Sequence, residues 1–244
     1  MLCQKSDIVR RLEREILPLQ GFKRVSGEGA CVGLGAIENA FPDGCFTTGA
    51  MHECISTSPE EAVATAGFTT SLIAKLMKTN GACVWISPNR KIFPPALKAY
   101  GIAPERILFV EAKKEKEALW VMGEALKCEG LTAVVGEISN LDFKASRRLQ
   151  LATEKSRVTG FIIRQNLRQI NTIACVARWK IAPLPSDTQT PGVGFKRWQV
   201  ELLKVRNGQP GVWEVEWKDR SFRIVEPEKN DVWQADTWLY GSAI

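Results

Sequence analysis

Short apolar runs alternate with longer amphipathic stretches through the middle of the chain. Five of these runs predict strands, at 51–56, 82–87, 107–110, 131–136 and 159–164. Helical spacing of apolar residues predicts helices between and after them, at 60–78, about 92–100, 114–128 and 141–154. Buried parallel sheets have continuously apolar strands, and their crossover helices cover both faces. We therefore predict an α/β fold with a mostly parallel sheet core flanked by helices.

The pattern changes near residue 170. Residues 171–184, "NTIACVARWKIAPL", predict a long strand, and 196–226 predict three antiparallel strands with turns at Asn207-Gly208 and Asp219-Arg220. In "VWEVEW", the side chains of Trp213, Val215 and Trp217 share one face and two glutamates share the other. We expect antiparallel strands to extend the parallel core near the C-terminus.

The two ends of the chain differ from this domain, which we place at 49–225. Residues 1–19 include an amphipathic helix by pattern, and 20–48 form a glycine- and proline-rich lead-in. The helix suits either self-association or docking on its own domain. The tail, 226–244, carries Trp233, Trp238 and Tyr240, which suit either capture of a partner or cover of a sheet edge.

Composition narrows the class of protein. No run approaches the roughly 20 apolar residues of a membrane-spanning helix, and the N-terminus lacks the apolar segment of a signal peptide, so we expect a cytoplasmic protein without membrane contact. Seven scattered cysteines without a C-x-x-C pair argue against disulfides or zinc, and a single histidine argues against a histidine-based metal site or catalytic triad. We expect no metal and no cofactor. A net charge of +6 permits contact with nucleic acid without demonstrating it.

An ordered series of segments resembles a known family. The segments are "VWISPNRKIFPPALKAYGI", "LDFKASRRLQLATEKSRVTGFIIR" and "RWQVELLKVRNGQPGVWEVEW". Over about residues 30–225 the chain resembles the ImuA family of error-prone repair proteins, which is RecA-like and is also grouped with SulA-like proteins. The resemblance implies a RecA-like fold and a role in DNA-damage-induced (SOS) translesion synthesis. It implies as partners an ImuB-type Y-family polymerase-like protein, an error-prone replicative-type polymerase, and also RecA and DNA.

The turn after the first strand occupies the place where RecA-like ATPases hold phosphate. Its residues are Ser56, Thr57, Ser58, Pro59, Glu60 and Glu61. Pro59 lacks an N–H donor, and at ~4 Å and an effective dielectric of ~20 each carboxylate would repel a phosphate charge by roughly 4 kcal/mol. The same residues suit a helix start, with Ser58 as N-cap and Pro59 in the first helical position. We predict a degenerate phosphate loop that binds no nucleotide.

Two further positions agree with a protein that is not an enzyme. A catalytic glutamate follows the second core strand in RecA-like ATPases, but here "PNRK" follows "VWIS". A magnesium-positioning aspartate ends a later strand, but here Gly136 ends it and Glu137 lies one place beyond, where it could be a magnesium ligand only if the register shifts. Two alternatives stay open: a divergent DNA-dependent ATPase and a SulA-like cell-division inhibitor. SulA-type chains resemble about 68–165 and lack the antiparallel extension, so 172–225 favours the ImuA family.

Basic residues supply the candidate contacts with DNA or partners. They are Arg164, Arg168, Lys196, Arg197, Lys204 and Arg206. The first two follow the strand "GFIIR", where the resemblance implies a DNA-facing loop; the alternative is solvated charges. The others lie among Trp198, Trp213 and Trp217, a combination that suits stacking on single-stranded nucleic acid. We favour the alternative that these tryptophans belong to the core.

Overall fold

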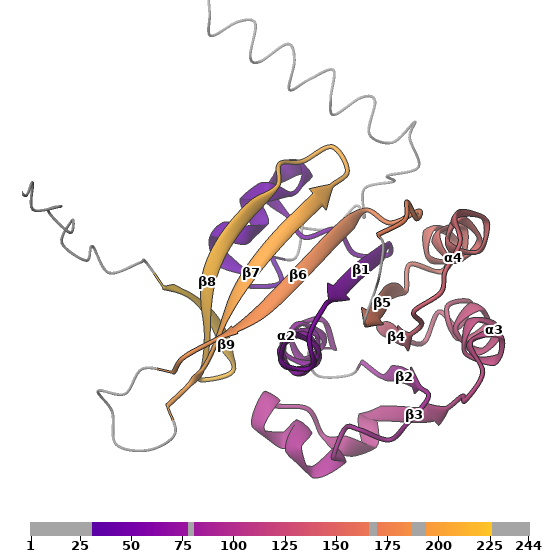
Figure 1. The fold of residues 1–244 in the computed structure, drawn as a ribbon, viewed down its shortest axis with the longest axis horizontal. Coiled ribbons are helices and arrows are strands. Elements are labelled where there is room, and N and C mark those ends of the chain that lie inside the picture. The colour runs from indigo at the N-terminus through magenta and orange to yellow at the C-terminus, as the bar shows by residue number, and fades with distance from the viewer. Residues whose placement is uncertain (1–30, 78–80, 166–169, 187–193, 226–244) are drawn as a thin grey trace, which may run out of the picture.

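A single mixed sheet organises the part of the chain that the structure describes (Figure 1). This computed structural model describes residues 31–77, 81–165, 170–186 and 194–225. The strand order is β3-β2-β4-β5-β1-β6-β7-β8-β9. The strands are β1 (Met51–Ser56), β2 (Cys83–Ser87), β3 (Ile107–Glu111), β4 (Ala133–Glu137), β5 (Thr159–Gln165), β6 (Ala177–Leu184), β7 (Lys196–Val205), β8 (Gly211–Lys218) and β9 (Ser221–Val225). Pairs among β1 to β6 are parallel, and β6 to β9 pair antiparallel.

Helices cover both faces of the parallel part. The α-helices are α2 (Pro59–Met77), α3 (Glu115–Ala125) and α4 (Phe143–Ser156), and the 3-10 helices are η1 (Gly35–Ala40), η2 (Pro42–Gly44), η3 (Pro94–Tyr100) and η4 (Pro104–Arg106). One apolar cluster joins α2, η1 and η3 to one face of the sheet, and a second joins α3 and α4 to the other face of β2, β4, β5 and β1. The fold class predicted from the sequence is therefore confirmed.

The antiparallel extension is held by aromatic packing. Phe68 of α2 contacts the rings of Trp179, Trp198 and Phe222, with centroids 5.4–6.0 Å apart. Trp198 and Trp217 are buried, so the core interpretation is confirmed for these two, whereas Trp213 is half-buried against the same apolar cluster. The described part of the lead-in, 31–48, packs onto the same face through residues such as Leu34, Ile37, Phe41 and Phe46.

Several element boundaries differ from the prediction for physical reasons. Residues 171–176 were predicted as strand, but β6 begins at Ala177. Residues 94–100 form a 3-10 helix and not an α-helix, and it ends at Gly101, whose φ of 85° is in the left-handed region. The turns are confirmed: Asp219 and Arg220 both have positive φ, 51° and 56°, as a two-residue type I′ hairpin requires.

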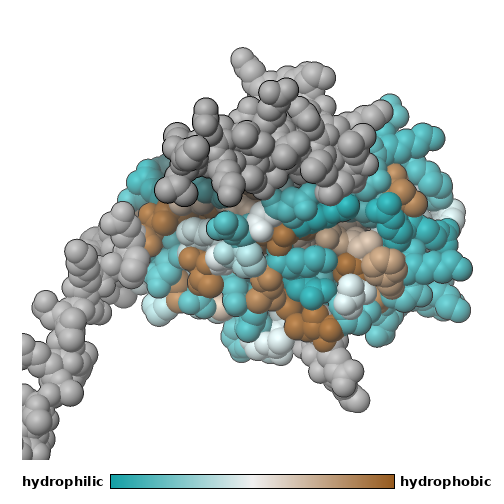
Figure 2. All heavy atoms as spheres, turned by 90° about the horizontal axis from the view of Figure 1, so that it is seen from above, coloured by the Kyte–Doolittle hydropathy of each residue, from teal (hydrophilic) through white to brown (hydrophobic). Residues whose placement is uncertain are grey.

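The predicted N-terminal helix, Arg168 and the tail residues Trp233, Trp238 and Tyr240 lie outside the described residues. None of the described helices is long and apolar enough to cross a membrane. On the face shown in Figure 2, apolar side chains lie in separate places among hydrophilic ones. The most exposed large apolar side chains include Val63, Phe93, Leu108 and Trp120.

Candidate functional site

The site where a nucleotide would sit lies at the carboxyl ends of the parallel strands. In open α/β sheets, ligands bind outside these ends, because loops and helix N-termini converge there. Here the turn after β1 and the ends of β2, β4 and β5 meet at this edge.

The β1–α2 turn is closed by the protein's own carboxylate. The Thr57 backbone N–H and hydroxyl both donate to Glu61 Oε2, over 2.7 and 2.8 Å, and Lys180 Nζ lies 3.3 Å from Glu61 Oε1. Ser58 Oγ accepts from the Glu61 N–H over 3.2 Å, and α2 begins at Pro59. The prediction of a helix start is therefore confirmed. Both donors of Thr57 that could face a phosphate are already used by Glu61.

Both acidic residues of this turn are charged at neutral pH. Burial raises the pKa of Glu61, but hydrogen bonds from Thr57 and the Lys180 ammonium outweigh it, so the pKa is lowered. A hydrogen bond from Ser58 lowers the pKa of the exposed Glu60. The turn therefore presents negative charge where a triphosphate would need positive charge.

Glu137 corrects one expectation about this edge. We predicted that it lies beyond the end of its strand, but β4 includes it as its last residue. Trp85 Nε1–H donates to Glu137 Oε1 over 3.0 Å. Burial raises the pKa of this carboxyl, against the hydrogen bond from Trp85 and the charge of Lys91. Across the described residues, no three Cys, His, Asp or Glu side chains gather to hold a metal ion.

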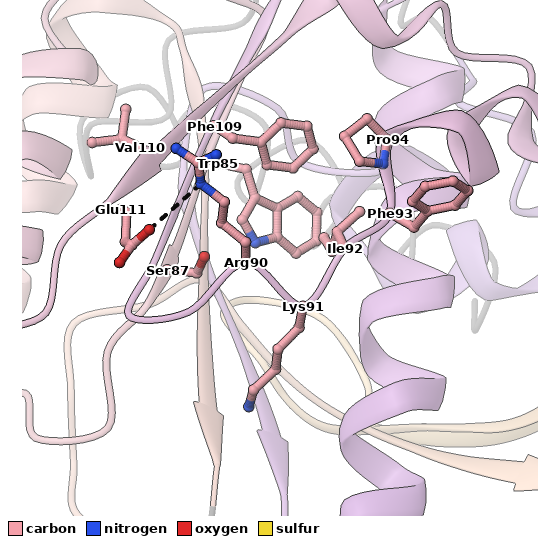
Figure 3. A pocket seen from close by; sticks show the side chains of 10 residues that line it. All are labelled: Trp85, Ser87, Arg90, Lys91, Ile92, Phe93, Pro94, Phe109, Val110 and Glu111. Carbon is pink, nitrogen blue, oxygen red and sulfur yellow. Dashed lines mark ion pairs between the residues drawn. The ribbon is translucent and has the colours of Figure 1, made fainter.

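A pocket of about 450 Å³ lies beside this edge, between the ends of β2 and β3 and the loop that follows β2 (Figure 3). Its lining residues are Trp85, Ser87, Arg90, Lys91, Ile92, Phe93, Pro94, Phe109, Val110 and Glu111. Arg90 Nε lies 3.5 Å from Glu111 Oε2, and Phe93 is 69% exposed. The pocket combines aromatic walls with a charged rim, which suits an apolar side chain flanked by polar groups. Sequence reasoning missed it, although the apolar residues of the loop "PNRKIFPP" were a signal.

A buried ion cluster corrects the expectation for Arg164. The side chain of Arg164 is 3% exposed, and its Nη1 lies 2.8 Å from Oε1 of Glu53, which is fully buried. Arg178 Nε contacts the other oxygen of Glu53 over 2.5 Å, and the Cys175 thiol donates to it over 3.6 Å. Arg164 is therefore neither a solvated charge nor a surface that DNA could contact, because its side chain is buried and bonded to Glu53.

The remaining basic candidates do not form one patch. Lys196 and Arg197 begin β7, whereas Lys204 and Arg206 lie at or beyond its other end, roughly 25 Å away at the rise of a strand. Lys196 is exposed with its ammonium 4.8 Å from the centroid of the Tyr100 ring, and Arg197 is paired with Glu216 over 3.2 Å. Contact of these residues with DNA or a partner stays a prediction.

Comparison with known proteins identifies relatives of this chain. It is 35% identical over 192 residues to Protein ImuA from two strains of Caulobacter vibrioides, and the match covers 73% of this chain and 79% of each relative. The chain belongs to the ImuA family. The resemblance inferred from the sequence is confirmed. No family model matches this ImuA-family chain. The crystal structure of SulA from Pseudomonas aeruginosa is 21% identical, with a TM-score of 0.41, and covers 47% of this chain and 97% of SulA.

Proposed function

We propose that this ImuA-family protein is a non-catalytic accessory protein of DNA-damage-induced, error-prone translesion synthesis. Membership of the ImuA family supports a role in error-prone repair. The observation that carries the non-catalytic part is the closed β1–α2 turn, in which Glu61 accepts both Thr57 donors and meets Lys180.

The energetics of this turn oppose a nucleotide in two ways. A phosphate would have to displace Glu61 from the two hydrogen bonds that Thr57 donates and from its ion pair with Lys180. The displaced carboxylate and Glu60 would then repel the phosphate, because both carry negative charge. A fold of the nucleotide-binding type that excludes nucleotide is suited to act through its surfaces.

The partners that we propose are those that the resemblance to the family implies. They are an ImuB-type Y-family polymerase-like protein and an error-prone replicative-type polymerase, with RecA and DNA as further partners. The pocket beside Phe93 supports binding of a protein partner. Its walls are aromatic and Phe93 at its rim is exposed, and residues that dominate binding at protein interfaces commonly insert into such pockets.

Thermal unfolding with and without Mg-ATP tests the non-catalytic part. A ligand at 100 times its Kd would add about 2.7 kcal/mol of stability, so a binding site would raise the Tm by several degrees. We expect no shift at millimolar Mg-ATP, with or without single-stranded DNA. A shift that is lost in a Thr57→Pro variant, together with ATP hydrolysis, would instead support the DNA-dependent ATPase.

Co-purification tests the accessory role. We expect the ImuB-type protein to be captured by the full chain and capture to weaken in Phe93→Ala, with Phe143→Ala on α4 as the matched exposed control. Deletion of 229–244 tests the predicted contribution of the tail to capture. Capture of the division protein FtsZ instead of the ImuB-type protein would favour the SulA-like alternative.

A further inference from the structure

The outer edge of β3 is open to another strand. We propose that β3 pairs antiparallel with β3 of a second copy of this chain, so that two sheets join about a two-fold axis. β3 ends the strand order and pairs with β2 alone among the described strands (Figure 1). Its outer backbone N–H and C=O groups therefore have no strand partner within the described part of the chain.

The sequence of β3 lacks the features that keep edge strands apart. Natural edges are usually protected by a central charge, a proline or a bulge. β3 reads Ile-Leu-Phe-Val-Glu, with its only charge at the end and no register shift against β2. Leu108, the second residue of the strand, is 64% exposed. The opposite edge, β9, is different: its central Arg223 is charged and paired with Asp219 over 2.7 Å.

The residues around β3 are complementary to themselves in one register. A two-fold axis at Phe109 sets Leu108 of each copy opposite Val110 of the other, which is an apolar pair. Antiparallel pairing also brings the end of β3 that follows η4, with the exposed Glu105, to the end of the other copy that carries the exposed Lys113, and symmetry repeats this approach of opposite charges. Isologous pairing thus matches the apolar centre and brings oppositely charged ends together, while Glu111 keeps Arg90 of its own chain as its partner, at 3.5 Å.

The side chain of Arg106 does not cover the outer edge of β3. Arg106, which precedes the strand, turns its guanidinium inward, with Nε donating to the Gly81 carbonyl over 2.7 Å and Nη2 to the Met77 carbonyl over 3.1 Å. Arg106 therefore links the end of α2 to the start of β3 and does not place a charge along the outer edge.

Sedimentation of the full chain over a wide concentration range tests this pairing. We expect a reversible dimer that Leu108→Lys abolishes, whereas Leu151→Lys, at an exposed apolar position of α4, leaves it intact. Glu105→Lys and Lys113→Glu should each raise the dissociation constant about fivefold or more, since two ion pairs become two like-charge contacts. The double variant Glu105→Lys with Lys113→Glu should restore it. Circular dichroism of each variant checks that the fold is retained.

Each outcome decides the proposal. Restored dimerisation in the double variant supports the register centred on Phe109. A chain that is monomeric at all concentrations overturns the proposal, as would be seen if its own terminal segments cover β3. A dimer that is indifferent to Leu108→Lys also overturns it and points to another surface, such as the predicted N-terminal helix. None of these results bears on the Mg-ATP experiment, so the two proposals fail separately.

Discussion

Lowering the pH from 7.5 to 5.0 should destabilise this protein through His52, its only histidine. The ring is fully buried in β1, stacked against Phe46 with centroids 4.5 Å apart. Its Nε2 lies 2.7 Å from the Thr47 carbonyl oxygen, which can only accept, so Nε2 carries the proton. Nδ1 then accepts from Trp179 Nε1–H over 3.4 Å. The neutral ring satisfies both nitrogens, whereas a second proton would set two donors against each other.

The magnitude follows from the pKa. Burial lowers the pKa of His52 from 6.5 to about 4, against the hydrogen bond to Thr47. Because the folded pKa lies below the unfolded one, the contribution is fully present above pH 6.5 and is lost as the pH falls towards 4. Linkage then predicts a loss of about 2 kcal/mol between pH 7.5 and 5.0, out of about 3 kcal/mol in total.

Urea unfolding, followed by tryptophan fluorescence at several pH values, measures this loss. His52→Phe keeps a ring beside Phe46 and removes the titration, and the carboxyl groups titrate in both chains. The difference in unfolding free energy between wild type and variant should therefore shift by about 2 kcal/mol towards the variant at pH 5.0. Parallel pH profiles, or a His52 resonance that titrates near 6.5 in the folded protein, would refute the reasoning.

Two further changes probe the core by chemical denaturation. Glu53→Gln leaves Arg164 and Arg178 without their counter-charge and should lower the free energy of unfolding by about 3–5 kcal/mol. Glu216→Gln, in a more exposed ion pair, should lower it by less than about 1 kcal/mol. Equal losses in the two variants would contradict the argument from burial. Gly160→Ala places a Cβ against Met51 Sδ and should cost about 1–3 kcal/mol, while Gly130→Ala has open space around it and should be neutral. A tolerated Gly160→Ala would show that Met51 repacks freely.

Much of the fold could be predicted from patterns among neighbouring residues. The β1–α2 turn was predictable because capping is a matter of adjacent residues: Ser58, Pro59 and the following glutamates suit a helix start whatever surrounds them. The faces of β8 were predictable because side chains alternate along any strand, and Val215 and Trp217 are buried as expected. The family was recognisable from an ordered series of segments.

Partners distant in the sequence were decided by the tertiary structure. Arg164 resembles a solvated charge until β1 brings Glu53, 111 residues away, to 2.8 Å. His52 resembles an ordinary strand residue until folding brings Trp179, 127 residues away, to 3.4 Å from its Nδ1. The pocket forms only where β2, β3 and a loop meet.

The sequence by itself thus determined most helices and strands, their order along the chain, and the presence of Glu60 and Glu61 where RecA-like ATPases bind phosphate. These features depend on periodicity and on neighbours a few residues apart. The tertiary structure alone decided which charges are buried, which edge is open and where a hollow remains. Those properties depend on residues that chain folding brings together from far apart, and on how much water their packing excludes.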